Sequence, residues 1–144
     1  MAPSISREVL DQLLIPSTAT LTTALKKHGL NNTFMHRVVP LGPGMKMAGQ
    51  AFTLRYIPAR EDLNAGEVDN LKDVQRIGIE QIGQDDVLVI DARGDTRSGT
   101  MGAILATRIQ VRGCSGIVTD GAYRDSPAIA AIGIPAYARA GSRW

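Results

Sequence analysis

The chain has 144 residues, 44% of them hydrophobic and 4% aromatic, and its 16 basic and 14 acidic side chains give a net charge of +2. This size and content predict one domain with one core, and the absence of a basic run argues against nucleic-acid binding. No apolar run approaches the ~20 residues that cross a bilayer, and the N-terminus lacks the basic-then-apolar order of a secretory signal, so we expect a cytoplasmic protein without membrane contact.

The N-terminal part of the chain predicts two helices. Residues 6–14 have helical spacing and are capped by Ser4 or Ser6. Residues 17–28 predict a second helix, which ends at Gly29 because glycine accommodates the left-handed turn at a helix C-terminus. The basic residues of its last turn, His28 included, suit the helix dipole and need no chemical role.

The middle of the chain predicts a loop, a strand and a helix. Residues 40–44, PLGPG, are typical of a loop, and residues 49–56 alternate like a strand with Ala51, Thr53 and Arg55 on one side. Residues 70–82 predict a helix whose inward side chains are Leu71, Val74, Ile77 and Ile82. The acidic residues around this helix predict a solvated face.

Residues 87–125 predict one complete βαβ unit. An apolar strand at residues 87–90 is followed by a glycine-rich turn. The helix at residues 102–112 has apolar residues Ile104, Leu105, Ile109 and Val111, with Arg108 and Arg112 free to face solvent. Gly113 ends this helix, and a second strand starts at residues 116–119.

Arg124 and Asp125 follow that second strand directly. Open α/β sheets bind ligands beyond the carboxyl ends of their strands, so we expect a site at this pair. Residues 126–133 then predict a short helix, started by Ser126 with Pro127 at its first position, and residues 134–138 predict another strand. The last residues show no pattern of either kind, and we expect a partner or further sequence to cover the open sheet edge.

Three interpretations are open for the turn from Gly94 to Gly102. Its G-x4-G-x2-G spacing fits neither the dinucleotide fingerprint nor the phosphate loop, which argues against a nucleotide site. The glycines could serve only tight turns and helix packing. Alternatively, the free N–H groups of Gly102, Ala103, Ile104 and Leu105 could bind an anion that Arg124 also holds, with a divalent cation on Asp125.

Four further side chains have structural and chemical interpretations. The lone Cys114 excludes an internal disulfide and gives no zinc pattern with the distant histidines, so we expect a small buried residue. Asp95, Asp120 and Tyr123 lie near the predicted site in sequence and could support it. We expect the two aspartates to be turn residues and Tyr123 to serve packing.

Residues 102–125, GAILATRIQVRGCSGIVTDGAYRD, resemble the RraA-like family, which includes the 4-hydroxy-4-methyl-2-oxoglutarate/4-carboxy-4-hydroxy-2-oxoadipate aldolases and the regulator of ribonuclease activity A. The likeness extends to STATLTTALKKHGL, PLGPGMKMAGQAFTLRY, DDVLVIDARGD and SPAIAAIGIPAYA, which lie between Ser17 and Ala138. It implies an α/β fold, a three-layer β/β/α sandwich of the swivelling-domain type, as a single RraA-like domain over residues 1–144. It also implies homotrimers or hexamers with sites at subunit interfaces.

The resemblance implies a function and assigns site residues. The residues matching Gly102, Ala103, Ile104 and Leu105, together with Arg124, would bind the pyruvate part of a 2-oxo acid, and Asp125 would hold Mg²⁺ or Mn²⁺. Arg124 and Asp125 would then be the catalytic residues of a metal-dependent lyase. Its reaction would be aldol cleavage of the 4-hydroxy-4-methyl-2-oxoglutarate type, oxaloacetate decarboxylation, or both, through a pyruvate enolate. The alternative is a noncatalytic member that regulates a ribonuclease.

Two departures from the family pattern accompany the resemblance. The aldolases generally carry Asp or Glu where this chain has Ala103, and that acidic residue helps to manage a water or a proton. Family members also continue well beyond the strand at residues 134–138, so we expect this chain to lack the family's C-terminal part. The ribonuclease regulators typically lack the metal-binding aspartate, and Asp125 therefore favours the enzyme.

Overall fold

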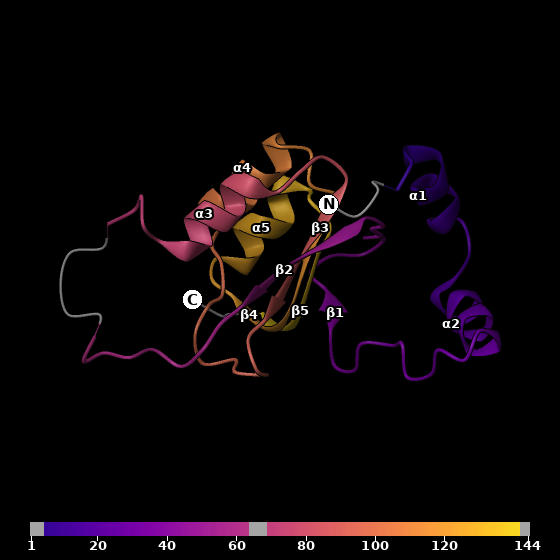
Figure 1. The fold of residues 1–144 in the computed structure, drawn as a ribbon, viewed down its shortest axis with the longest axis horizontal. Coiled ribbons are helices and arrows are strands. Elements are labelled where there is room, and N and C mark those ends of the chain that lie inside the picture. Colours follow the sequence, from indigo (N-terminus) through magenta and orange to yellow (C-terminus); the bar gives the residue numbers. More distant parts are fainter. Residues whose placement is uncertain (1–4, 64–68, 142–144) are drawn as a thin grey trace.

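The computed structural model describes residues 5–63 and 69–141, which form a mixed five-stranded sheet with helices (Figure 1). The sheet order is β1-β5-β4-β3-β2; the four longer strands run parallel, and β1 pairs antiparallel with β5. The strands are β1 (Val39–Pro40), β2 (Gln50–Arg55), β3 (Asp86–Asp91), β4 (Gly116–Tyr123) and β5 (Ala136–Gly141). The predicted α/β class is confirmed, and of its three layers the described residues supply one β layer and the α layer.

Within the described residues, five helices accompany the sheet: α1 (Arg7–Leu13), α2 (Thr18–Lys27), α3 (Val74–Gln81), α4 (Ala103–Val111) and α5 (Ser126–Ile132). The last three pack together along the sheet, whereas α1 and α2 stand apart from them at one end of the long axis (Figure 1). None of the helices in residues 5–63 and 69–141 is both long and apolar enough to cross a membrane.

The serine cap predicted for the first helix and the glycine end predicted for the second are confirmed. The Ser6 hydroxyl accepts a hydrogen bond from the Val9 N–H, and α1 begins at the next residue; the alternative cap, Ser4, lies outside the described residues. The Ser17 hydroxyl accepts from the Thr20 N–H at the start of α2. Gly29 follows α2 with a positive φ of 79°, the left-handed conformation that glycine adopts without strain.

The core lies between the sheet and the helices α3 to α5. Strand β4 is at the centre of the sheet and is buried along nearly its whole length, as expected for a parallel strand covered on its faces. Edge strand β2 alternates instead, and its exposed side is the predicted set of Ala51, Thr53 and Arg55. Cys114 is buried as predicted, and burial raises the pKa of its thiol.

The helix predicted at residues 70–82 is shorter than predicted, and a different side of it faces the core. It starts at Val74, and Leu71, Val74 and Ile77, predicted inward, are 89%, 73% and 40% exposed. The core contacts come from Gly78, Ile79 and Ile82. The reason is steric: a Cβ on Gly78 would lie only 2.9 Å from Leu54 Cδ2, so this glycine lets α3 approach β2 closely.

The apolar face predicted for helix α4 is confirmed in part. Of its four residues, Ile109 is fully buried and Leu105 packs against the core, whereas Ile104 and Val111 are 84% and 74% exposed. Ala106, which was not predicted, is fully buried. Arg108, predicted to face solvent, donates two hydrogen bonds to the Glu80 carboxylate of α3 at 2.8 and 2.7 Å. Arg112 reaches the same carboxylate, so the two arginines join α4 to α3.

Three predictions about loops and ends are corrected by sheet pairing and helix capping. Pro40, assigned to a loop, belongs to β1, which pairs with β5 and covers part of the edge expected to be open. Strand β5 runs from Ala136 to Gly141, later than the predicted 134–138, because parallel pairing with β4 continues to Gly141. Ser126 is the first residue of α5, and its N-cap is Asp125.

Candidate functional site

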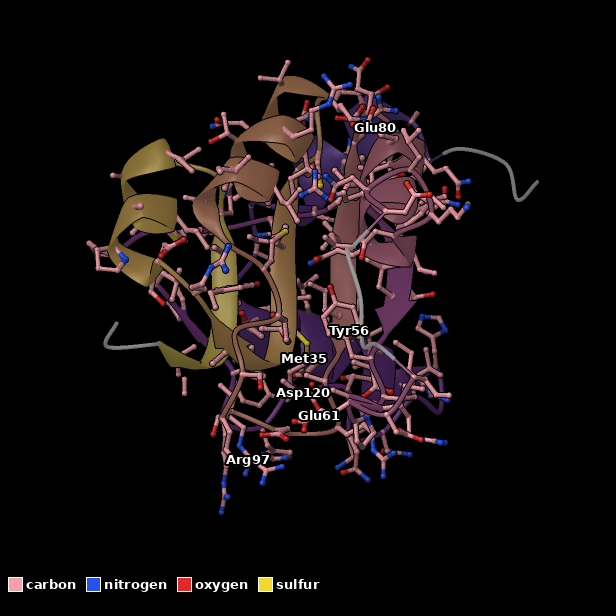
Figure 2. The ribbon with its side chains drawn as sticks, turned by 90° about the vertical axis from the view of Figure 1, so that its left-hand side faces the viewer. Met35, Tyr56, Glu61, Glu80, Arg97 and Asp120 are labelled. Atoms are coloured by element: carbon pink, nitrogen blue, oxygen red, sulfur yellow. The ribbon has the colours of Figure 1, made fainter. Side chains whose placement is uncertain are left out.

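The predicted pair Arg124 and Asp125 lies immediately beyond the carboxyl end of the central strand β4. The pairing of β4 with β5 shifts register between Thr119 and Ala122, and such bulges re-aim the residues that follow. Tyr56, which follows β2, and Asp120 lie toward this end of the sheet, and Glu80 lies toward the other (Figure 2). The site thus occupies the edge at which parallel strands usually bind ligands.

The glycine-rich loop after β3 is tied across this end of β4 by two residues. The Asp120 carboxylate accepts hydrogen bonds from the N–H groups of Ala92 and Gly94, each at 2.7 Å. Thr100 donates to the Ala122 carbonyl from its N–H at 2.7 Å and from its hydroxyl at 2.9 Å. Asp120 therefore stabilises a turn, as predicted. The loop places the start of α4 next to the end of β4.

Gly102 is where the predicted site residues meet. It is the N-cap of α4, and no side chain among the described residues caps the helix there, so first-turn N–H groups remain available. A Cβ at Gly102 would lie 3.0 Å from Asp125 Oδ2 and 3.1 Å from Arg124 Nη2. Both side chains therefore pack against the glycine, in an arrangement that a larger residue would obstruct.

The backbone fixes Arg124 and Asp125 while their side chains remain accessible. The Arg124 N–H donates to the Met101 carbonyl at 2.9 Å. Arg124 Nε and Asp125 Oδ2 are 3.6 Å apart, and the side chains are 71% and 45% exposed, so this ion pair contributes little to stability. Asp125 has a left-handed φ of 59°, and its carboxylate makes no capping hydrogen bond with α5, which leaves it free for a ligand.

A cavity of about 270 Å³ opens beside Arg124, which lines it, whereas Asp125 does not. One wall is formed by Arg124, the turn before α4 and the first residues of α4. These are Gly99, Thr100, Met101, Gly102, Ile104 and Leu105. The other wall comes from α3 and the residues before it: Asn70, Asp73, Gln75 and Arg76. The sequence interpretation missed this second wall, because no spacing signal shows that residues 70–76 fold against a turn some 25 residues later.

Two side chains hold the Thr100 carbonyl, which precedes the Gly102 cap by two residues. Tyr56 donates its hydroxyl to that oxygen at 3.0 Å, and Gln75 donates from Nε2 at 2.7 Å. Burial, with a smaller contribution from the Asp73 charge, raises the pKa of Tyr56 to about 12. The hydroxyl therefore stays protonated and remains a donor at neutral pH.

We expect Tyr56→Phe and Gln75→Leu to destabilise the fold more together than separately. Each single change should lower the free energy of unfolding by about 1 kcal/mol, because the Thr100 carbonyl keeps its other donor. The double variant should lose about 1–3 kcal/mol beyond the sum, since the carbonyl of buried Thr100 is then left without either side-chain donor. Urea unfolding of the four proteins measures this coupling, and strictly additive losses would show that the two donors do not act on one acceptor.

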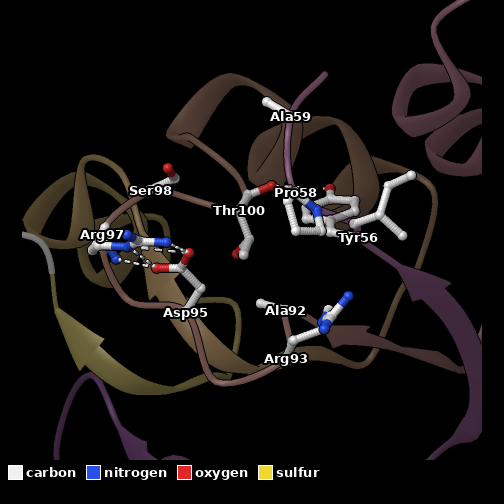
Figure 3. A pocket seen from close by; sticks show the side chains of 11 residues that line it. Tyr56, Pro58, Ala59, Ala92, Arg93, Asp95, Arg97, Ser98 and Thr100 are labelled. Carbon is white, nitrogen blue, oxygen red and sulfur yellow. Dashed lines mark hydrogen bonds and ion pairs between the residues drawn. The ribbon is translucent and has the colours of Figure 1, made fainter. Parts of the chain in front are cut away.

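A neighbouring cavity of about 390 Å³ (Figure 3) shares Gly99 and Thr100 with the cavity beside Arg124. Asp95 lines it and is paired with Arg97, whose guanidinium holds the pKa of that carboxyl at about 2. Tyr123 is fully buried and donates its hydroxyl to the Tyr137 carbonyl at 2.9 Å. Asp95 is thus a turn residue and Tyr123 a packing residue, and neither joins the Arg124 and Asp125 group.

The donor set around Asp125 suits one class of metal ion. In residues 5–63 and 69–141 no cluster of three or more His, Cys, Asp or Glu side chains could enclose a metal. Structural zinc requires such a closed set. Mg²⁺ instead keeps several waters and binds through one or two carboxylates plus substrate oxygens, which a single accessible aspartate next to Arg124 can satisfy.

Comparison with known proteins gives a family match over nearly the whole chain. Residues 18–143 match the family model described as RraA-like, Aldolase/RraA. The chain is 27% identical over 129 residues to Protein DlpA of Legionella pneumophila, a match that covers 90% of this chain and 20% of that protein. The chain therefore spans about a fifth of the length of this curated relative.

Two solved structures show the same fold. Streptomyces coelicolor RraAS2, described as an unusual member of the RNase ES inhibitor RraA family, superposes with a TM-score of 0.85 at 27% identity, over 99% of this chain and 67% of that one. The RNA-processing inhibitor RraA from Thermus thermophilis gives 0.63 at 27% identity, over 85% of this chain and 68% of that one.

Proposed function

The chain belongs to the RraA-like family, and we propose that it is a divalent-metal-dependent lyase that cleaves 2-oxo acids to release pyruvate. The family includes metal-dependent lyases and noncatalytic ribonuclease inhibitors. The observation that favours the lyase is the meeting of Arg124 and Asp125 at the uncapped start of α4. A cation, a guanidinium and a helix N-terminus at one point suit an anionic substrate.

In this proposal Arg124 and the start of α4 bind the substrate. The Arg124 guanidinium donates a two-pronged hydrogen bond to the carboxylate next to the 2-oxo group. The N–H groups of Ala103, Ile104 and Leu105, with Gly102 as the cap, face the same negative charge. Asp125 holds Mg²⁺ or Mn²⁺, which when bound supplies a Lewis acid that stabilises charge on the 2-oxo group.

Two reactions share this arrangement. In aldol cleavage of a 4-hydroxy-4-methyl-2-oxoglutarate type substrate, the C3–C4 bond breaks, the C4 hydroxyl gives its proton to water and C4 becomes a carbonyl. In oxaloacetate decarboxylation, the C3–C4 bond breaks and CO₂ leaves. In both, the electron pair passes to the pyruvate enolate, which a water-borne proton converts to pyruvate; Arg124 fixes the substrate throughout.

The assembly and location belong to the same proposal. We expect a homotrimer or a hexamer in the cytoplasm, in which a neighbouring subunit borders the site, with a small 2-oxo acid as the substrate. Arg124 is 71% exposed in the single chain, which leaves room for such a neighbour. Light scattering coupled to size exclusion measures the assembly directly.

The test of the function is pyruvate release from oxaloacetate and from 4-hydroxy-4-methyl-2-oxoglutarate, measured with Mg²⁺ or Mn²⁺ and then with EDTA. Activity that EDTA abolishes supports the lyase. Absence of turnover with either substrate, at any metal concentration, contradicts it.

The second candidate function is a noncatalytic binding protein that regulates a ribonuclease. It is favoured by Ala103, which stands where the aldolases generally carry an acid, and by the likeness to RraA proteins whose names describe RNase or RNA-processing inhibition. A measurable complex with a ribonuclease, in a protein that shows no pyruvate release, would select this alternative.

We expect Ala103→Asp to raise pyruvate release about tenfold. Ala103 is the first residue of α4, where the helix dipole tolerates a carboxylate, and it follows the glycine that touches Asp125. A carboxylate here can orient a water that delivers the proton, and positioned acid–base groups typically contribute about 10²–10⁴-fold. The matched control is Ala103→Asn, which has the same shape without a base; an equal rise in both variants, or none in Ala103→Asp, would contradict a proton-transfer role.

A further inference from the structure

The neighbouring cavity of about 390 Å³ takes no part in the proposed lyase site, yet it lies where two parallel strands end. One wall is the segment after β2, from Tyr56 to Ala59, and the other consists of residues of the loop after β3, between Ala92 and Thr100. Crevices beyond the carboxyl ends of parallel strands are usual ligand sites. The volume also lies within the ~300–1,000 Å³ of small-molecule pockets.

The lining of this cavity is apolar on one side and charged on the other. Ile57, Pro58 and Ala59 form an apolar wall, and the Ile57 side chain is 73% exposed although it borders a cavity. Ala92, which is buried, adds a further apolar group from the loop after β3. A ligand that covers this wall would remove apolar surface from water, which favours binding.

The charged side carries one net positive charge. Its charged residues are Arg93, Asp95 and Arg97. The Asp95 carboxylate accepts hydrogen bonds from Arg97 Nε and Nη2 at 3.0 and 2.7 Å, so these two charges neutralise each other. Arg93 lies apart from that pair in the cavity (Figure 3). The charge of Arg93 therefore remains for a ligand with a single negative charge.

The backbone of Arg93 is strained. Its φ is 59°, in the left-handed region that side chains other than those of Asn and Asp rarely adopt. Hydrogen bonds of the loop impose this conformation: the Arg93 N–H donates to Asp91 Oδ1 at 2.9 Å, and Asp120 accepts from the residues on either side, Ala92 and Gly94. Strained residues of this kind cluster at active sites and ligand clamps.

The combination of strain and position distinguishes Arg93 from similar arginines. Arg37, Arg76 and Arg139 also form no ion pair with any residue that the structure describes, so a missing partner alone indicates nothing. Arg37 has the same backbone, with a φ of 62°, but does not line this cavity. Arg76 lines the other cavity from a regular helix, and Arg139 lies against Gly94.

We propose that this cavity binds a small monocarboxylate with an apolar body, whose carboxylate pairs with Arg93 while its apolar part covers Ile57 and Pro58. A guanidinium fork matches the two oxygens of a carboxylate. A single negative charge balances the net charge of the lining, whereas a dianion would bring its second charge toward Asp95. The site is separate from the lyase site, and its test does not depend on that function.

The test compares benzoate with two probes that each lack one of its features. Benzamide has the ring without the charge, and acetate has the charge without the ring. Amide chemical shifts of the labelled chain, followed during titration, should give a Kd for benzoate about tenfold below that of either probe. The shifts should centre on Ala92, Arg93 and Ser98. An equal Kd for benzamide or acetate, or shifts centred on Ile104 and Leu105 in the other cavity, overturns the proposal.

Arg93→Asn separates ligand binding from folding. Asparagine tolerates the left-handed backbone, so the urea midpoint of this variant should equal or exceed that of the unaltered chain. The Kd for benzoate should nevertheless rise about tenfold, to that for benzamide. Arg93→Lys keeps the charge without the fork, and its Kd should lie between. An arginine that served only the fold would give the opposite pattern, a lower urea midpoint with unchanged binding.

Arg37→Asn is the matched control, because it makes the same substitution at the same backbone conformation outside the cavity. It should change the urea midpoint in the same direction and leave the Kd for benzoate unaltered. Unchanged benzoate binding in Arg93→Asn, or an equal loss in both variants, overturns the assignment. A urea midpoint of Arg93→Asn below those of Arg37→Asn and the unaltered chain also overturns it, since Arg93 would then stabilise its own loop.

Discussion

Replacing Asp125 with asparagine is expected to lower metal-dependent pyruvate release by roughly 10³-fold, which corresponds to about 4 kcal/mol of barrier. Asparagine keeps the size of the side chain but removes the charge that would hold the cation. The fold should be preserved for two reasons. Asparagine tolerates the left-handed backbone of this position, and the Asp125 carboxylate makes no capping hydrogen bond with α5.

Asparagine is a sharper test than alanine at this position. A non-glycine residue other than Asn or Asp pays roughly 1–2 kcal/mol for the left-handed conformation, so a loss of activity in Asp125→Ala would mix backbone strain with loss of the ligand. The expected readouts are kcat/KM with Mg²⁺ and the urea midpoint. The urea midpoint should show that the free energy of unfolding changes by no more than about 0.5 kcal/mol, as is usual for surface substitutions.

Asp85→Asn is the matched control for this variant. Asp85 also has a positive φ, 64°, and precedes β3, at the opposite end of the strand from the loop that leads to the site. Its partner is Arg7, in a partly exposed ion pair that contributes about 0–1 kcal/mol. Normal turnover in Asp85→Asn with a loss in Asp125→Asn assigns the effect to the site. Retained metal-dependent turnover in Asp125→Asn would remove Asp125 as the ligand.

The elements that local patterns specify were predicted well from the sequence. The strand, turn, helix and strand of residues 87–125 form as expected, because the apolar runs are bounded by glycines that end each element. The meeting of Gly102 with Arg124 and Asp125 was also predictable, since a strand end and the start of the preceding helix share one edge of a parallel sheet.

The features that the sequence could not predict depend on contacts distant along the chain. Helix α3 turns its Gly78 side to the core because Leu54 of β2 packs there, and periodicity alone favoured the other face. The same rotation brings Gln75 to the Thr100 carbonyl and Arg76 to the cavity. Residues 70–82 were predicted as a helix and the acidic residues around it as a solvated face, because charge in a sequence does not show which side chains meet a distant turn.

Arg124→Lys is expected to lower kcat/KM for the 2-oxo acid by roughly 10²-fold, divided between a higher KM and a lower kcat. Lysine keeps the positive charge, so a role in general electrostatics would survive the change. It cannot donate two parallel hydrogen bonds from a fixed plane, however, and the substrate carboxylate would lose its orientation relative to Asp125. The guanidinium also packs against Gly102, where Nη2 and Nε lie 3.1 and 3.2 Å from the position of a Cβ.

The control for this change is Arg97→Lys, in the neighbouring cavity. Arg97 also donates a two-pronged hydrogen bond to a carboxylate, that of Asp95, and its side chain is 88% exposed. The same substitution there should leave kcat and KM unchanged, because Arg97 does not line the cavity of Arg124. Steady-state kinetics of both variants, with pyruvate as a product inhibitor, separates the effects: Arg124→Lys alone should weaken pyruvate inhibition. Unchanged kinetics and unchanged pyruvate inhibition in Arg124→Lys would reduce Arg124 to a structural residue at the end of β4.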